Sequence, residues 1–347
     1  MVKSKDKHLL VIRLSAMGDV AMTVPVLLAL TRTHPTLQIT VLTRPFFAPI
    51  FRNIPNLKVY TIDVKDKHKG ILGLYRLSKE LKKIPFTGVA DLHNVLRTKI
   101  LKVLLSGKGM PFVHIDKGRK EKKLLTAWKN KTIKPLKTTH ERYADVFRQL
   151  GYQVELSPRD VFQSIQPSAS VKKYLGDQTL KTIGIAPFAA FSGKMYPIEL
   201  LEEVLEKFNN TNRYKIILFG GGAKEIKILK KLENTYTRCS NVAGILPFEE
   251  ELGLISNLDL MLSMDSGNGH LSAMFSVPTL TLWGITHPYA GFAPFVHGPE
   301  LSILADREQY PYIPTSVYGN KYPKGYERAM DTIDPQDVFR KMESLLN

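Results

Sequence analysis

Short apolar runs alternate with longer amphipathic stretches along the whole chain. The runs rich in β-branched and large apolar residues cover residues 8–16, 38–44, 58–63, 88–93, 112–116, 182–188, 215–222, 258–267 and 278–284. Between them, stretches such as 198–210 and 223–233 carry apolar residues at helical spacing. A strand that is buried on both faces of a sheet appears in the sequence as a continuous apolar run. Parallel strands that alternate with helices are joined by right-handed crossover connections. The pattern therefore predicts two Rossmann-like domains, each a parallel sheet covered by helices.

A change in composition marks the predicted boundary between these domains. Over residues 164–178, Ser, Pro, Gly and Gln replace the periodic apolar pattern, before a new strand begins at Thr182. We therefore expect an N-terminal domain over residues 1–170 and a C-terminal domain over residues 171–331.

A helix is predicted at the end of the chain, over residues 332–347. Asp334 is placed as its N-cap and Pro335 at its first helical position. Val338 and Met342 lie on one apolar face. This face must pack against another part of the protein.

The composition narrows the class of protein. The chain has 347 residues, of which 44% are hydrophobic and 23% charged, so it can bury two ordinary cores. It has no apolar run of about eighteen residues, and it passes from charged residues directly into a strand without a signal peptide. We therefore expect a cytoplasmic protein. The single cysteine, Cys239, excludes an internal disulfide framework and a cysteine-based zinc cluster.

The formal net charge of +17 favours anionic partners. Nucleic acid, the headgroups of a cytoplasmic membrane leaflet and a phosphorylated substrate all fit this charge, and charge alone does not choose among them. The basic residues have no interleaved aromatic platform, RNA-binding signature or zinc motif. We therefore expect no nucleic-acid partner.

The first candidate site follows the opening strand. Gly18 permits a tight backbone and a helical pattern starts after it, so Asp19 lies at a strand-to-helix junction. Ligands of open parallel sheets bind beyond the carboxyl ends of the strands, so this carboxylate is expected to face the cleft. The structural alternative is an N-cap aspartate that accepts hydrogen bonds from backbone N–H groups. The segment lacks the G-x-G-x-x-G spacing of a dinucleotide site.

The second candidate site is a small, polar, glycine-rich turn between a buried strand and a helix. Asp265, Ser266 and Gly267 open this turn, and Gly269 closes it. Small residues leave backbone N–H groups accessible, and the positive end of the helix dipole favours an anion such as a diphosphate. His270, one turn into the helix, can add a hydrogen-bond donor. A simple capped helix and a packed structural histidine are the alternatives.

Two further loops support a phosphate site. Lys194 lies just before a predicted helix, so its ammonium can reach the same cleft and neutralise a departing diphosphate, while Ser192 can donate one hydrogen bond. Gly221 belongs to a glycine-rich strand end, with Glu225 nearby to accept from a ribose hydroxyl or a base. The alternatives are a surface lysine in a mobile loop and an ordinary glycine-rich strand end.

Together these segments resemble glycosyltransferase family 9, the ADP-heptose:lipopolysaccharide heptosyltransferases. The similarity keeps the same order along nearly the whole chain, through residues 9–30, 90–100, 194–204, 215–225 and 241–288. Its most specific part is the D-S-G-x-x-H-L-x-A turn with the P-T strand that follows. The resemblance implies a GT-B fold, in which two Rossmann-like parallel-sheet domains face each other across a cleft. It also implies that the terminal helix returns to the N-terminal domain.

The resemblance further implies the roles of residues at matching positions. Asp19 matches the catalytic base that takes the proton of the acceptor hydroxyl, and Lys194 matches the lysine on the phosphate side. The residues expected at the nucleotide-sugar site are Ser192, Lys194, Gly221, Glu225, Leu246, Asp265, Ser266, Gly267 and His270. The residues expected at the acceptor site are Ser15, Gly18 and Arg97, the last of which can pair with an acidic group. An inverting displacement without a metal ion or a cofactor follows.

The chain departs from the family pattern in places that bear on its substrate. Ala189 and Ala190 stand where hydroxyl residues often contact phosphate, and residues 314–333 contain none of the cysteines of many relatives. We expect a monomer whose partners are ADP-heptose or a related nucleotide sugar, a lipopolysaccharide-core acceptor and the anionic inner face of the cytoplasmic membrane. The alternatives are a GT-B enzyme that uses another nucleotide sugar, an epimerase, and a non-catalytic sugar-nucleotide-binding protein.

Overall fold

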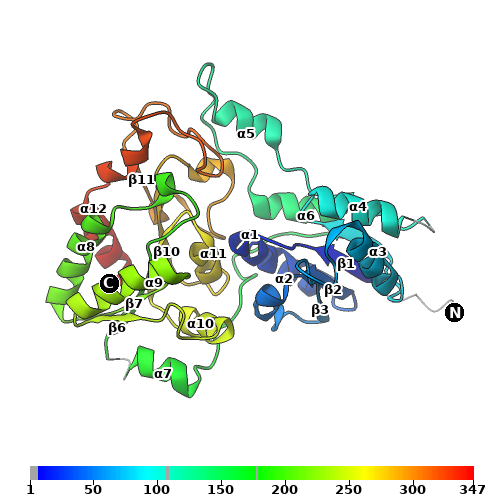
Figure 1. Ribbon diagram of the computed structural model, residues 1–347, viewed down its shortest axis with the longest axis horizontal. Coiled ribbons are helices and arrows are strands. Elements are labelled where there is room, and N and C mark those ends of the chain that lie inside the picture. Colours follow the sequence, from blue (N-terminus) through cyan, green and yellow to red (C-terminus); the bar gives the residue numbers. More distant parts are fainter. Residues whose placement is uncertain (1–6, 107–108, 177–178) are drawn as a thin grey trace. The chain divides into compact units, whose positions relative to one another are not determined.

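The computed structural model describes residues 7–106, 109–176 and 179–347 (Figure 1). The chain divides into two compact units. The first unit consists of Met1–Lys117 and Thr139–Val161, and the second of Gly118–Thr138 and Phe162–Asn347. Among the described helices, none combines the length and the apolar character that crossing a membrane requires.

The first unit contains a five-stranded parallel sheet in the order β3-β2-β1-β4-β5. Its strands are β1 (His8–Ile12), β2 (Gln38–Thr43), β3 (Leu57–Thr61), β4 (Gly88–Asp91) and β5 (Phe112–His114). Its helices are α1 (Met17–Ala21), α2 (Thr23–Thr33), the 3-10 helix η1 (Pro45–Phe51), α3 (Gly70–Leu81), α4 (Leu96–Leu105) and α6 (Thr139–Gln149). Each apolar run predicted in the first half of the chain forms one of these strands.

Alternation of side chains along β1 separates the two faces of this sheet. Leu10 and Ile12 share one core cluster with Leu74 and Leu77 of α3 and Leu101 of α4. Helices α3 and α4 contact each other, whereas α2 contacts α6. Because α3 and α4 follow β3 and β4 along the chain, their first turns lie at the edge of the sheet where the strands end.

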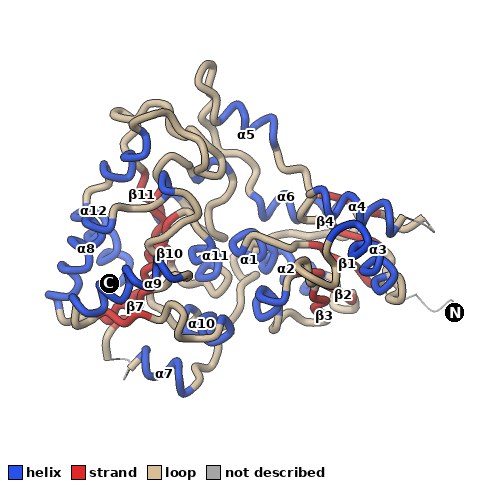
Figure 2. Tube along the Cα trace, in the orientation of Figure 1, coloured by secondary structure: helices blue, strands red, loops and turns tan. Residues whose placement is uncertain are grey.

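The second unit contains a six-stranded parallel sheet in the order β11-β10-β9-β6-β7-β8. Figure 2 draws its strands in red. Its strands are β6 (Lys181–Ala186), β7 (Tyr214–Leu218), β8 (Cys239–Asn241), β9 (Leu260–Met264), β10 (Thr279–Trp283) and β11 (Ser302–Leu304). Its helices are α5 (Arg119–Leu125), α7 (Ala169–Leu175), η2 (Ser192–Lys194), α8 (Ile198–Thr211), α9 (Ala223–Thr235), α10 (Phe248–Ile255), α11 (Gly267–Ala273), η3 (Pro288–Ala290), η4 (Pro299–Leu301), η5 (Tyr326–Thr332) and α12 (Pro335–Leu346). The predicted class, α/β with two parallel sheets, is confirmed.

The terminal helix forms with the predicted cap but packs on a different partner from the predicted one. The Asp334 side chain accepts a hydrogen bond from the backbone N–H of Gln336 at 2.8 Å. Val338 and Met342 of α12 lie in the core of the second unit, and α12 contacts α8 and β9 of that unit. The prediction that this helix packs on the N-terminal domain is therefore wrong. Its apolar face completes the core beside α8 instead.

The predicted boundary at residue 170 lies within a helix of the second unit. The two units separate after Val161, and Ser168 is the N-cap of α7, where its side chain accepts from the backbone N–H of Val171 at 3.3 Å. The polar residues that resemble a linker in the sequence therefore start a helix, as serine at an N-cap does.

A second difference is the segment Gly118–Thr138, which the sequence places in the N-terminal domain. The Lys131 ammonium donates to the backbone carbonyls of Tyr312 at 2.8 Å and Pro314 at 2.7 Å. The Trp128 ring lies 5.0 Å from that of Tyr312. These contacts join the segment to the second unit, so the chain passes between the units after Lys117, after Thr138 and after Val161.

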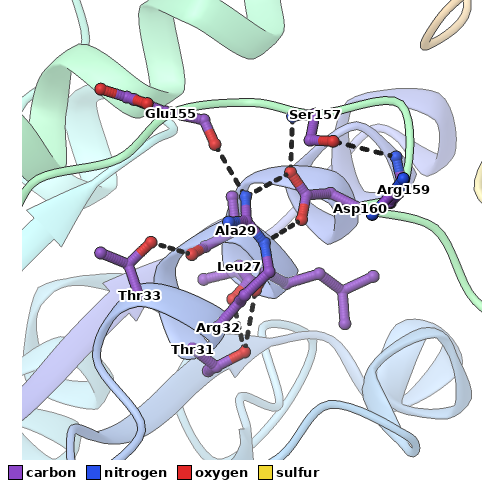
Figure 3. A network of polar contacts seen from close by, with 10 residues as sticks. Leu27, Ala29, Thr31, Arg32, Thr33, Glu155, Ser157, Arg159 and Asp160 are labelled. Atoms are coloured by element: carbon purple, nitrogen blue, oxygen red, sulfur yellow. Dashed lines mark hydrogen bonds and ion pairs between the residues drawn. The ribbon is translucent and has the colours of Figure 1, made fainter.

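A bidentate ion pair fixes the end of the first unit (Figure 3). Arg32 of α2 donates from Nε and Nη2 to the two carboxylate oxygens of Asp160, at 2.9 and 3.1 Å. Its Nη2 also donates to the backbone carbonyl of Glu155 at 2.9 Å. Asp160 accepts in addition from the backbone N–H of Ser157 at 2.7 Å. Two parallel hydrogen bonds between an arginine and a carboxylate fix the orientation of both groups. The segment that follows α6 is therefore held against α2 before the chain enters the second unit.

Candidate active site

Asp19 lies where the opening strand of the first unit leads into α1, as predicted. Its Oδ2 is 2.5 Å from Nη2 of Arg13, the first residue after β1, and accepts from the backbone N–H of Ala16 at 3.3 Å. The Asp19 side chain is 28% exposed, whereas that of Arg13 is 7% exposed. A buried guanidinium therefore fixes the orientation of a carboxylate that solvent can still reach.

Arg13 is held in turn by the neighbouring strand and by α6. Its Nη1 donates to the backbone carbonyl of Leu92, just after β4, at 2.6 Å. Its guanidinium lies over the ring of Tyr143, 5.8 Å from the ring centroid. The Tyr143 hydroxyl donates to the backbone carbonyl of Asp19 at 3.3 Å. Three contacts, from the end of β4 and from α6, thus hold the Arg13–Asp19 pair.

The turn after β4 brings His93 to the same edge of the sheet. The Oδ1 of Asp91 accepts from the backbone N–H groups of His93 and Asn94, each at 2.9 Å. His93 is 9% exposed, and its Nδ1 is buried without a hydrogen-bond partner among the described residues. Most buried polar atoms have a hydrogen-bond partner, so this unpaired ring nitrogen sets the His93 site apart.

Positive charges surround this histidine. Burial, followed by the charges of Arg13, Lys117 and Arg97, lowers the pKa of His93 to about 3, against the opposing effect of Asp19. The predicted residue Arg97 therefore belongs to the same group of charges as Asp19. This cationic group suits a ligand that carries carboxylates or phosphates.

We expect His93 to stay neutral between pH 5 and 8. Its pKa of about 3 in the folded protein lies below the ordinary value of 6.5, so an unfolded chain binds a proton that the folded protein does not. Its contribution to stability is present above pH 6.5 and is lost as the pH falls toward 3. NMR titration of the ring nitrogens, assigned with the His93→Gln variant, measures this pKa. A midpoint above pH 5 for His93 contradicts the expectation.

Ser15 and Gly18, the other predicted acceptor residues, lie in the short segment that joins β1 to α1. The carbonyl of Gly18 accepts from the backbone N–H of Met22 at 2.8 Å. Gly18 lies inside α1, where the backbone is helical. A role of these two residues in binding stays a prediction.

In the second unit, Lys194 and Asp265 meet at the edge where the strands end. The Lys194 Nζ is 3.0 Å from Oδ2 of Asp265, and the two side chains are 12% and 10% exposed. Lys194 ends η2, after β6, and Asp265 follows β9, the strand beside β6. The structure thus brings the predicted lysine to the predicted turn.

The cysteine-free segment 314–333 supports this lysine. A Cβ at Gly319 would lie 2.3 Å from Cδ of Lys194, so the lysine stem packs directly on the Gly319 backbone. The Ser192 hydroxyl lies 2.9 Å from that of Tyr322. Both ends of η2 are therefore held by this segment.

The remaining residues of the predicted nucleotide-sugar site lie at the same edge. Glu225 is in the first turn of α9, and its Oε2 accepts from the backbone N–H of Gly221 at 2.8 Å. Leu246 lies between β8 and α10. Ser266 is the N-cap of α11, and His270, on that helix, is 8% exposed. Gly267 opens α11.

Several residues of these two sites are not predicted from the sequence. Arg13 carries a signal, because a charged residue directly after a buried strand lies at the ligand edge of a parallel sheet. The same rule points to His93, two residues after β4. Gly319 and Tyr322 carry no such signal, since their contacts with η2 depend on the path of a long irregular segment.

Comparison with known proteins identifies the family. Residues 74–305, more than half of the chain, match the model of "Glycosyltransferase family 9 (heptosyltransferase)". The chain belongs to glycosyltransferase family 9. It is therefore a glycosyltransferase.

Relatives of known activity resemble the family 9 chain over most of its length. It is 24% identical to the lipopolysaccharide core heptosyltransferase OpsX of Haemophilus influenzae, over 81% of this chain and 80% of that protein. It is 26% identical to lipopolysaccharide heptosyltransferase 1 of Campylobacter coli, over 80% of this chain and 84% of that protein.

Solved structures resemble it in fold. The glycosyl transferase family 9 protein of Veillonella parvula has a TM-score of 0.76 at 19% identity, covering 99% of this chain and 98% of its own. The E. coli ADP-heptose lps heptosyltransferase II has a TM-score of 0.68 at 18% identity, covering 98% of both chains. The GT-B fold class implied by the resemblance is confirmed.

We expect a methyl group at Gly319 of this family 9 chain to displace Lys194. The Gly319→Ala variant would place a Cβ against the lysine stem, at a residue with φ of +83°. The affinity for the diphosphate that this site is predicted to bind should fall on the order of tenfold, about 1.4 kcal/mol. Isothermal titration with ADP measures this loss. The matched control is Gly325→Ala, at φ of +93° with no atom within 4 Å of the added Cβ. Equal loss in both variants would indicate backbone strain instead of displacement of Lys194.

Proposed function

We propose that this glycosyltransferase transfers a heptose from ADP-heptose to an acceptor in the core of lipopolysaccharide. The names of the relatives support this substrate class, since the two curated relatives described above are heptosyltransferases of lipopolysaccharide. The observation that carries the proposed chemistry is the Asp19 carboxylate, fixed by Arg13 at the end of β1. The acceptor would be bound by the first unit and the donor by the second.

Asp19 would act as the general base. Arg13 and the backbone of Ala16 contact its Oδ2, and the described residues form no hydrogen bond to its Oδ1. This second oxygen can take the proton of the acceptor hydroxyl as the hydroxyl oxygen attacks the anomeric carbon of the donor. The carboxylate keeps its orientation during the transfer because Arg13 is itself held by Leu92 and Tyr143.

The cations near His93 would hold the acceptor. Arg97 and Lys117 act on the same histidine as Arg13 does, so an acceptor with carboxylates or phosphates would be attracted to this edge of the sheet. The acidic sugars and phosphates of an inner core have this chemistry. This property supports a lipopolysaccharide-core acceptor over a neutral one.

Lys194 would stabilise the departing diphosphate. Its ammonium lies 3.0 Å from Asp265, next to the turn of small residues that opens α11. When the bond between the anomeric carbon and the phosphate oxygen breaks, negative charge develops on the diphosphate, and a fixed ammonium in a largely buried site stabilises it. The attack and the departure on opposite faces invert the anomeric carbon. Because Lys194 supplies the positive charge, we propose that no metal ion is required.

The choice of nucleotide tests the donor directly. Thermal-shift measurements with ADP, UDP, GDP and CMP should give the largest rise in Tm with ADP. A larger rise with UDP would point to another nucleotide sugar. Transfer at the same rate with and without EDTA is expected, and loss of transfer with EDTA would overturn the proposal that no metal ion is required.

A further inference from the structure

Two neighbouring helices of the first unit expose large apolar side chains. On α3, Ile71 is 70% exposed, Leu72 83% and Tyr75 48%. On α4, Leu96 is 75% exposed and Val103 72%. Helices α3 and α4 contact each other, and they are drawn side by side in Figure 1. Single exposed apolar residues are ordinary, but such a group on adjacent helices marks an interaction surface.

Cations accompany these apolar residues on both helices. Arg76 and Lys79 of α3 and Lys99 and Lys102 of α4 are all exposed. Within the described helix α3, Glu80 is the single carboxylate, and Lys67 pairs with it at 2.8 Å. Helix α4, also fully described, contains no carboxylate. The charge on the exposed sides of these helices is therefore positive throughout.

The apolar residues begin at the edge of the sheet where Asp19 lies. Ile71 and Leu72 are in the first turn of α3, and Leu96 opens α4. Leu96 is followed directly by Arg97, whose charge acts on His93. A flat partner that touched the first turns of α3 and α4 would therefore lie beside the proposed acceptor site.

We propose that the exposed sides of α3 and α4 dock the protein on an anionic lipid bilayer. We name this the α3–α4 surface, which consists of Ile71, Leu72, Tyr75, Arg76, Lys79, Leu96, Lys99, Lys102 and Val103. Apolar side chains with lysines and arginines on one side of a helix enter the boundary between headgroups and acyl chains, and anionic lipids attract the cations. The uniform positive charge matches an anionic lipid surface. The inference rests on the proposed function, because a lipid-linked acceptor in that bilayer would be presented beside Asp19.

Sedimentation with vesicles tests this surface. Wild-type protein should bind vesicles of phosphatidylcholine mixed with phosphatidylglycerol in equal amounts, bind phosphatidylcholine alone more weakly, and lose binding as salt is raised. The double variant Ile71→Ser/Leu72→Ser should lower the partition coefficient by about tenfold or more, since both apolar side chains are lost. The variant Arg76→Gln/Lys79→Gln should weaken binding to the mixed vesicles and reduce its salt dependence.

A matched control uses the second exposed apolar and basic segment of the chain. Leu124 of α5 is 53% exposed and Trp128, after it, is 58% exposed. The Leu124→Ser/Trp128→Ser variant should bind the mixed vesicles as the wild type does. The inference is overturned if this control loses binding, if the Ile71→Ser/Leu72→Ser variant keeps it, or if the wild type shows no preference for anionic vesicles. Equal Tm values of the variants and the wild type exclude unfolding as the cause.

Failure of docking is distinguishable from failure of the proposed function. Vesicle binding is measured without donor or acceptor. On a water-soluble core acceptor without acyl chains, Ile71→Ser/Leu72→Ser should have the wild-type kcat/KM, because these side chains lie outside the proposed catalytic group. Absence of transfer by every protein would overturn the proposed function and leave the vesicle result unchanged.

Discussion

Replacement of Asp19 by asparagine should lower kcat by about 10²- to 10⁴-fold, the range that a positioned general base contributes. Asparagine keeps the size of the side chain and an oxygen that Arg13 can contact, but it cannot take the proton of the acceptor hydroxyl. The affinity for ADP should stay unchanged, because Asp19 belongs to the first unit and the proposed donor site to the second. Steady-state kinetics with ADP-heptose, together with titration of ADP, separates the two effects.

Controls are needed because the variant also removes a charge from the partly buried pair with Arg13. Thermal unfolding shows whether the loss of kcat accompanies a loss of fold. The Asp66→Asn variant removes an exposed carboxylate of the same unit and should keep wild-type kcat. A kcat of Asp19→Asn within about tenfold of the wild type, below the range of general-base catalysis, would exclude Asp19 as the base.

Replacement of Lys194 by methionine should lower kcat/KM by about 10²- to 10³-fold, the effect of removing one fixed donor from a developing anion. Methionine keeps an apolar stem that can pack on Gly319 but lacks the ammonium. ADP should bind more weakly, whereas an acceptor bound alone should keep its affinity. Kinetics with varied donor, and titration with ADP, measure the loss.

The matched control for this variant is another lysine of the second unit that pairs with an aspartate. Lys181 lies 3.2 Å from Asp259, and the two side chains are 55% and 35% exposed. Exposed pairs of this kind contribute little, so Lys181→Met should keep wild-type kinetics. Because Lys194→Met leaves Asp265 without its partner in a largely buried position, a lower Tm is also expected. Wild-type ADP affinity in Lys194→Met would contradict the assignment.

The sequence predicts the strands well because burial on both faces leaves a strong signal. The apolar runs correspond to strands of the two sheets, and the strands missed are β8, whose residues Cys-Ser-Asn form no apolar run, and the short β11. The helix over Pro335–Leu346 is also predicted, but its partner is not. An amphipathic pattern shows that one face of a helix is buried, whereas the surface that covers this face depends on the rest of the fold.

For the candidate sites, the sequence predicts where a residue lies in the fold better than it predicts which residue it contacts. The rule that ligands bind beyond the ends of parallel strands places Asp19, Lys194 and Asp265 correctly at sheet edges. The pairing of Asp19 with Arg13 arises from a local loop, and the contact of Lys194 with Gly319 joins residues far apart in the chain. Neither depends on a periodic pattern, so neither can be inferred from spacing alone.

Transfer itself tests the central claim most directly. Wild-type protein is incubated with ADP-heptose and a truncated lipopolysaccharide-core acceptor, and mass spectrometry follows the acceptor while a coupled assay follows ADP. We predict that one heptosyl residue is added per ADP released, and that Asp19→Asn forms this product at least about 10² times more slowly. An acceptor that gains no heptosyl residue from the wild type, or equal rates for the wild type and Asp19→Asn, would contradict the account.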